Sequence, residues 1–216
     1  MKFSLRRKIL SFSYNFSTII SIILYPALLP TWVFAVLFFW FLDLYDIEIE
    51  SKLRLTSLVF LTTFAIPVLL IKLLELLNIL DDFRMPTRQS RKIPLSILSI
   101  YYLLIVVFFV YKINVGLTIN LIISAFGLII LWGTLLTFFY KVSLHALGIG
   151  GMLGIFFGLH FRTIADFFEI ILITTILSGI LMSARLRLKA HNSWQIWSGF
   201  LIGLTSSFIL FYIFTI

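Results

Sequence analysis

The stretch Leu117–Tyr140, LTINLIISAFGLIILWGTLLTFFY, runs for 24 residues without a charged side chain. A helix needs about 20 predominantly apolar residues to cross a hydrocarbon core about 30 Å thick. This stretch meets that length, and it is continuously apolar, whereas a strand of an outer-membrane barrel alternates apolar and polar residues. It therefore predicts a transmembrane helix.

The composition of the 216-residue chain extends this prediction to the whole protein. Hydrophobic residues make up 61% of the chain and charged residues 12%, and the mean hydropathy is +1.12. Soluble domains average about half apolar and a quarter charged residues, so too little polar surface remains here for a soluble enzyme. The absence of cysteine excludes a disulfide-built module and thiolate metal sites. We predict an all-α fold, a polytopic transmembrane helical bundle.

Five further stretches have the length and composition of membrane spans: Leu53–Leu80, Pro94–Tyr111, Leu144–Phe161, Ile164–Ala184 and Trp194–Ile216. With Leu117–Tyr140 they make six spans, and no linker rich in proline, serine or charge divides them. We expect about seven spans in all, within a range of six to eight. An N-terminal anchor (1–42) would precede a helical bundle (43–216).

The N-terminal anchor allows two arrangements. Its apolar run, Ile9–Leu42, is too long for one straight helix and is interrupted by Pro26 and Pro30. It forms either one kinked span after an interfacial helix, Met1–Asn15, or a tight hairpin of two spans.

Glycines recur at a spacing of four residues in two of the spans, as Gly150, Gly154 and Gly158 and as Gly199 and Gly203. In lipid this spacing lets two helices approach closely. We interpret it as packing inside the bundle rather than as a dimer interface.

Basic residues gather in a few places along the chain. Twelve of the 17 lie at the N-terminus or in three short stretches between spans: Lys2, Arg6, Arg7 and Lys8; Arg84, Arg88, Arg91 and Lys92; Lys141; Arg185, Arg187 and Lys189. Two spans separate each of the three stretches from the next, so all three lie on one face of the membrane. The alternate turns carry Asp43, Asp46, Glu48 and Glu50, or Lys112 alone. Either the basic residues mark the cytoplasmic side, or they also form a convergent anion site.

Histidine favours the anion site. Two of the three histidines, His145 and His191, fall in the second and third basic stretches. Topology signals do not require histidine, so its presence beside Lys and Arg favours a functional site. The third, His160, lies at the opposite end of its helix and is interpreted as structural.

The third basic stretch carries Arg185, five residues, His191, three residues and Gln195. This pattern resembles the third signature motif of the type 2 phosphatidic acid phosphatase superfamily, which reads Arg, five residues, His, three residues, Asp. Arg185 and His191 match in identity and spacing, whereas Gln195 stands where the family has Asp.

Two earlier stretches resemble the family's other motifs in the same order. Ser143-Leu144-His145 keeps the Ser and His of Pro-Ser-Gly-His, without its Pro and Gly. Arg84 and Arg91 match only loosely the first motif, which reads Lys, six residues, Arg-Pro. The resemblance extends from about Arg84 to Gly203, over half of the chain.

The resemblance implies a core of the phosphatidic acid phosphatase type 2 kind and hydrolysis of lipid phosphates through a phosphohistidine, without a metal or another cofactor. His191 would be the nucleophile and His145 the general acid. Gln195 would take the place of the Asp that orients the nucleophile.

Phosphate binding would fall to the basic side chains. Arg185 and Arg91, with Arg88 and Lys141 as further candidates, would hold the phosphoryl oxygens, and Ser143 could donate its hydroxyl. Guanidinium suits this role because its planar fork pairs with phosphate through two hydrogen bonds. Plausible substrates are phosphatidic acid, phosphatidylglycerophosphate and polyprenyl diphosphates. The implied setting is a multi-pass protein of the cell's inner membrane with membrane lipids, and no nucleic acid, as partners.

Gln195 leaves the activity open. An amide oxygen can accept the Nδ1 proton of His191 but carries no charge, and loss of the analogous Asp in serine hydrolases costs about four orders of magnitude in kcat. The sequence permits a slower enzyme, an enzyme in which Asp81 or Asp82 supplies the carboxylate, or an inactive relative. The inactive relative would bind, transport or help to assemble lipid phosphates.

Overall fold

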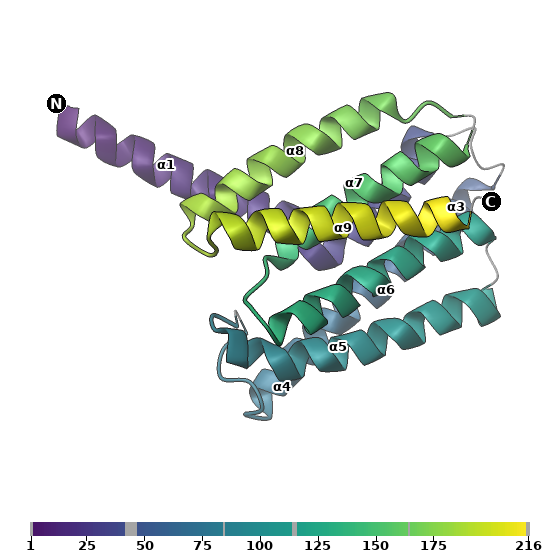
Figure 1. Cartoon of the computed structure of the whole chain (residues 1–216), viewed down its shortest axis with the longest axis horizontal. Helices are drawn as coiled ribbons and strands as arrows, with labels where there is room; N and C mark the ends of the chain where they lie inside the picture. Colours follow the sequence, from purple (N-terminus) through teal and green to yellow (C-terminus); the bar gives the residue numbers. More distant parts are fainter. Residues whose placement is uncertain (1, 42–46, 84, 114–115, 164, 215–216) are drawn as a thin grey trace.

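The computed structural model describes residues 2–41, 47–83, 85–113, 116–163 and 165–214, with the backbone alone at 2–12. Every regular element within these ranges is helical (Figure 1). In chain order they are α1 (Lys2–Ile23), η1 (Pro26–Leu28), α2 (Leu29–Ala35), η2 (Val36–Trp40), α3 (Ile49–Phe60), η4 (Leu61–Ala65), α4 (Ile66–Leu76), α5 (Arg88–Phe108), η5 (Phe109–Ile113), α6 (Leu117–Thr137), α7 (Leu144–Arg162), α8 (Phe168–Arg187) and α9 (Ser193–Ile213). Arg84, Asp43 and Asp46 lie outside the described residues.

In the described part of the chain, six helices are long and apolar enough to cross a membrane: Ile49–Leu76, Arg88–Ile113, Leu117–Thr137, Leu144–Arg162, Phe168–Arg187 and Ser193–Ile213. Ser13–Ile23 and Pro26–Trp40 pass the same test together, although they are bent by 40° at the break; counted as one span, they make a seventh. The prediction of an all-α membrane bundle with about seven spans is confirmed. α5 begins earlier than hydropathy indicates, at Arg88 rather than Pro94, because a capping box of Thr87 and Ser90 extends it.

The N-terminal anchor is a bent span rather than a hairpin. α1 continues through residue 15 into the bundle without a separate interfacial helix, and the 40° bend redirects the chain without reversing it. Pro26 causes the break, because the residue before a proline is pushed out of the helical region; Tyr25 has an extended backbone with ψ of 134°. The indole Nε1 of Trp32 donates to the carbonyl of Ile23 (3.0 Å), which the break leaves unpaired.

A second proline interrupts the next span. Pro67 has no N–H to offer the carbonyl of Thr63, and the hydroxyl of Tyr102 donates to that oxygen instead (2.8 Å). Tyr101 donates in the same way to the carbonyl of Thr62 (2.8 Å). Two tyrosine hydroxyls of α5 therefore bond to the π-helical turn η4 that precedes Pro67.

α7 lies at the centre of the bundle and packs most extensively against α9. A Cβ on Gly150 or Gly154 would overlap the backbone oxygen of Phe200 or Leu204, and one on Gly203 would overlap that of Leu147. The close approach of these helices requires glycine on both sides. The interpretation of the glycine spacing as packing within the bundle is confirmed.

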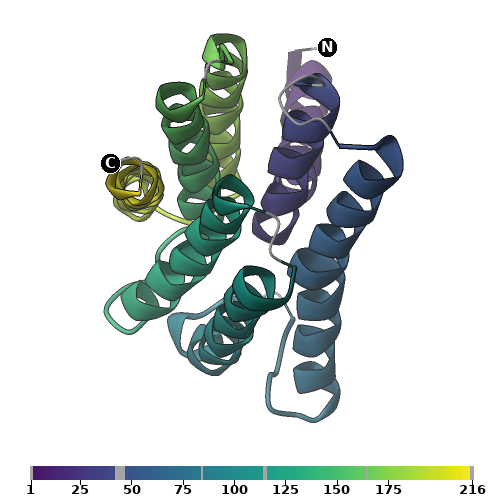
Figure 2. The same ribbon diagram turned by 90° about the vertical axis from the view of Figure 1, so that its right-hand side faces the viewer.

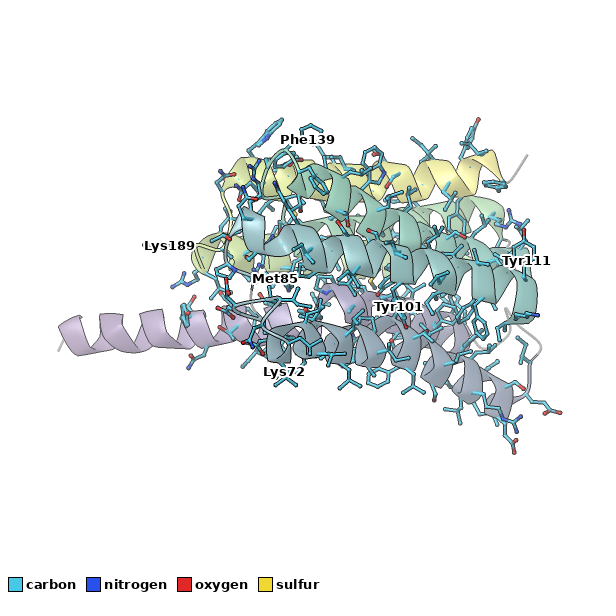
Figure 3. All side chains as sticks on the ribbon, turned by 90° about the horizontal axis from the view of Figure 1, so that it is seen from below. Lys72, Met85, Tyr101, Tyr111, Phe139 and Lys189 are labelled. Atoms are coloured by element: carbon cyan, nitrogen blue, oxygen red, sulfur yellow. The ribbon has the colours of Figure 1, made fainter. Side chains whose placement is uncertain are left out.

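The turns α4–α5, α6–α7 and α8–α9 lie together at one end of the bundle, which we call the basic end. The first half of α1 projects beyond this same end (Figure 1). In Figure 3, Met85, Phe139 and Lys189 lie at the basic end and Tyr111 at the other. Figure 2 views the bundle from that other end, with α3 and α4 on one side and α7 and α8 on the other. The N-terminal basic residues and the three basic stretches thus belong to segments on one side of the membrane.

Candidate functional site

A cavity of about 600 Å3 opens at the basic end and extends into the bundle. Four of the sequence-predicted site residues line it: Arg91 from α5, His145 from α7, Arg185 from α8 and His191 from the α8–α9 turn. Its deeper wall is apolar and comes mainly from α4, α5 and α6. Arg88, Lys141, Ser143 and Gln195 do not line the cavity.

Arg91 is held firmly at the cavity wall. It is buried, its Nε donates to the carbonyl of Met85 (3.0 Å) and its Nη1 donates to that of Val142 (3.1 Å). Two fixed hydrogen bonds to backbone restrict the guanidinium to one orientation. Its Nη2 makes no hydrogen bond to the described residues and is available to a ligand.

Arg185 has no comparable support. Within the described part of the chain its guanidinium makes no hydrogen bond or ion pair, and its Nε is fully buried without a partner. A buried donor without a partner costs about 1–3 kcal/mol, and more when it is charged. Arg91 is close enough to interact with it electrostatically, and none of the described residues that line the cavity is acidic. Two guanidinium groups therefore face a cavity that lacks negative charge.

The backbone explains why Arg185 and His191 meet. α8 ends in a Schellman motif, in which the N–H of Ala190 donates to the carbonyl of Arg185 (3.2 Å) and the N–H of Lys189 to that of Leu186 (2.9 Å). Lys189 adopts the left-handed conformation that this motif requires, with φ of 52°. The chain reverses there, so His191 follows the turn and faces the same cavity as Arg185.

A capping box fixes His191 from the other side. Asn192 is the N-cap of α9, and the side chain of Gln195 accepts from the Asn192 N–H (3.3 Å). The same Oε1 lies 3.1 Å from Nδ1 of His191. Because an amide oxygen only accepts, Nδ1 carries the proton and Nε2 keeps its lone pair.

His191 remains neutral over a wide pH range. Burial, together with nearby positive charges of which Arg91 has the largest effect, lowers the pKa of His191 to about 4, although the hydrogen bond to Gln195 acts in the opposite direction. A neutral imidazole with a free Nε2 lone pair is the form that acts as a nucleophile.

His145 is engaged by the N-terminal span. Its Nε2 lies 3.0 Å from the carbonyl oxygen of Ser21 in α1. The N–H of Tyr25, which would otherwise take that oxygen in a continuous helix, bonds to Ile22 instead (3.2 Å). Since a carbonyl only accepts, Nε2 of His145 carries a proton that is committed to Ser21.

The four candidates outside the cavity stabilise the turns of the basic end. Arg88 donates to two carbonyls just past the end of α6, those of Phe138 (3.3 Å) and Phe139 (2.7 Å). Lys141 donates to the carbonyl of Ala190 (3.3 Å). Burial lowers the pKa of Lys141, and the charges of the two cavity arginines lower it too.

Ser143 and Gln195 join two helix starts. Ser143 is the buried N-cap of α7, and its Oγ accepts from the N–H of Ala146 (3.4 Å). Its own N–H donates to the backbone oxygen of Gln195 (3.1 Å). The second and third motif-like stretches are thereby fixed to each other.

Sequence reasoning missed the part that α1 plays. Ser21 and Tyr25 line the cavity, as does Tyr102 of α5. Tyr25 stands edge-on to His145, with ring centroids 5.7 Å apart. The sequence signal that could have indicated this is the Tyr25-Pro26 pair. A proline there interrupts the span, which frees backbone carbonyls of the preceding turn and places the polar ring of Tyr25 at the break.

The third histidine lies at the far end of α7, as expected of a structural residue. Nδ1 of His160 accepts from the N–H of Phe167 (3.4 Å) and lies 3.7 Å from Asp166. Asp81 and Asp82 do not line the cavity.

Comparisons with protein-family models, with curated proteins and with solved structures find no match for this chain.

Proposed function

We propose that this protein is an integral-membrane lipid phosphatase that hydrolyses a phosphate or diphosphate headgroup through a phosphohistidine, without a metal. The observation that carries the proposal is the guanidinium of Arg185, which makes no hydrogen bond or ion pair with the described residues and faces a cavity shared with Arg91 and His191. Burying like charges together is unfavourable unless a counter-charge is supplied. A phosphoryl group supplies that charge, and it matches the fork of hydrogen-bond donors on guanidinium.

The chemistry follows from the tautomer of His191. Its Nε2 lone pair forms a bond to phosphorus as the bond from phosphorus to the lipid oxygen breaks. Arg91 and Arg185 neutralise the charge on the non-bridging oxygens, which is the main requirement of phosphoryl transfer. Water then attacks the phosphorus, the N–P bond breaks, and inorganic phosphate leaves.

The cavity favours a lipid over a soluble phosphate ester. Beyond the two arginines its wall consists of apolar side chains such as Ile71, Leu95 and Ile129. Such a wall accommodates hydrocarbon, whereas a sugar or nucleoside would leave its polar groups unpaired.

We assign the protein to the cell's inner membrane with the basic end in the cytoplasm, following the positive-inside rule.

The test is phosphate release from phosphatidic acid and from a polyprenyl diphosphate in detergent micelles containing EDTA. We expect turnover by the natural protein and none by His191→Ala. Arg187→Ala is the matched control, because Arg187 is exposed on the same helix and does not line the cavity. Equal activity of the natural protein and His191→Ala, or no release by either, would refute the proposal.

A second candidate is a lipid-phosphate binding protein that does not hydrolyse its ligand. The neutral side chain of Gln195 and the committed Nε2 proton of His145 favour it. It predicts phosphate binding that depends on Arg185 but no acid-labile ³²P on His191 after incubation with labelled lipid. Detection of that label would eliminate it.

A further inference from the structure

The proposed reaction needs a proton donor for the oxygen that leaves phosphorus. An alkoxide is a poor leaving group, and protonation by a positioned acid contributes about 10²–10⁴-fold in rate. The family resemblance assigns this proton to His145. In this chain the Nε2 proton of His145 is bonded to Ser21, and a second proton would add a third positive charge beside Arg91 and Arg185 without a carboxylate among the lining residues.

The hydrogen bonds of the cavity's hydroxyl groups narrow the choice of proton donor. Those of Thr18, Ser21 and Tyr102 donate to backbone carbonyls within 3.1 Å. Among the described residues that line the cavity, the tyrosine hydroxyls without a hydrogen bond are those of Tyr14 and Tyr25. Tyr14 is 57% exposed and stands at the rim, toward the projecting half of α1. Tyr25 lies further inside, at the break of the helix.

Tyr25 is also placed among the reacting groups. Its ring packs edge-on against His145, and it is close enough to Arg91 for the two to interact electrostatically. Pro26 keeps its backbone extended and outside the helix, and its ring is also held edge-on by Phe64 of η4, with centroids 6.3 Å apart. Burial makes a tyrosinate at this position costly, and the positive charge of Arg91 offsets part of that cost when the phenol gives up its proton.

We infer that Tyr25 is the general acid of this site, an inference that rests on the proposed phosphatase function. As Nε2 of His191 bonds to phosphorus, the electron pair of the breaking P–O bond passes to the lipid oxygen, which takes the hydroxyl proton of Tyr25. Water then attacks the phosphorus of the phosphohistidine and returns one proton to the Tyr25 oxygen as the N–P bond breaks. His145, held by Ser21, is a positioning residue that supports the ring of Tyr25.

The test compares two phosphate esters that differ in their need for an acid. Dodecyl phosphate has an alkoxide leaving group and needs protonation, whereas p-nitrophenyl phosphate has a stable leaving anion. Tyr25→Phe keeps the ring and its contact with His145. We expect kcat to fall about 100-fold or more on dodecyl phosphate and less than about tenfold on p-nitrophenyl phosphate.

Two tyrosine variants serve as controls. Tyr102→Phe removes a hydroxyl that supports the backbone at Pro67, so any loss should be the same factor on both esters. Tyr111→Phe, exposed at the other end of the bundle and outside the cavity, should leave both rates unchanged. An equal loss on both esters in Tyr25→Phe, with an unaltered melting temperature, would overturn the assignment while leaving the phosphatase proposal intact. A natural protein that hydrolyses neither ester and releases no phosphate from phosphatidic acid or a polyprenyl diphosphate would overturn both.

Discussion

Replacing Arg185 by methionine should make the ligand-free protein more stable while abolishing its affinity for phosphate. Methionine keeps most of the length of the side chain and removes the charge. The buried Nε without a partner costs about 1–3 kcal/mol, and that cost disappears in Arg185→Met. For a chain of this size each kcal/mol corresponds to about 2–4 °C, so the melting temperature should rise by about 2–12 °C.

The expected loss of affinity follows from the same guanidinium. Two charge-assisted hydrogen bonds to one phosphoryl group contribute about 1.5–3 kcal/mol each, which corresponds to about 10²–10⁴-fold in Kd. At a phosphate concentration 100 times its Kd, the natural protein gains about 2.7 kcal/mol. At that concentration Arg185→Met should gain at most about 0.4 kcal/mol.

The assay is thermal unfolding in detergent, followed by tryptophan fluorescence, with and without inorganic phosphate. Phosphate is the expected product, so it binds without being turned over. Arg187→Met is the matched control, because it removes one positive charge from the exposed face of the same turn of α8. A melting temperature of Arg185→Met below that of the natural protein, or an equal phosphate-induced rise in both, would show that Arg185 is not an unsatisfied anion ligand.

Three further predictions concern the nucleophile, the packing and the topology. The lowered pKa of His191 keeps its imidazole neutral down to about pH 4. We therefore expect kcat/KM to show no acid limb from this residue between pH 7 and 5 and to fall tenfold per pH unit below pH 4. An acid limb near pH 6.5 in the pH–rate profile would contradict this. Gly203→Ala should lower stability by about 3 kcal/mol or more because its Cβ overlaps a backbone oxygen of α7, whereas Gly179→Ala, in open space, should raise stability by about 0.5–1 kcal/mol in the same melting assay. The chain has no cysteine, so Gln89→Cys and Asp166→Cys can be labelled singly, and an impermeant maleimide should reach them from opposite sides of the membrane.

The spans could be predicted from the sequence because lipid leaves the backbone few alternatives. A continuous apolar stretch in a bilayer must satisfy its own hydrogen bonds, so length and hydropathy suffice to locate a helix such as α6. The consequences of prolines inside spans could not be predicted in the same way. Which side chain takes over the carbonyls freed at Pro26 and Pro67 depends on neighbouring helices, here through Trp32 and Tyr102.

The candidate site was predictable where its geometry is local. Arg185 and His191 are joined by one helix end and one turn, so their spacing alone implies that both face the same space. Arg91 and His145 come from other spans, and the two spans between their basic stretches predicted that they share a membrane face. For Arg88 and Lys141 the sequence could not show that their charges cap helix ends, because the capped carbonyls belong to distant turns. The sequence shows that a residue is basic, but not which carbonyl oxygen its side chain will bind.

The position of Gln195 connects the fold to the chemistry most closely. One side-chain oxygen both caps α9 through the N–H of Asn192 and receives the Nδ1 proton of His191. Glutamine thereby fixes the tautomer and the orientation of His191, although its side chain carries no negative charge. That charge matters when the imidazole becomes cationic on bonding to phosphorus. In the proposed reaction Arg91 and Arg185 would hold the phosphoryl group against Nε2, so its negative charge would offset the cationic ring from the side opposite Gln195.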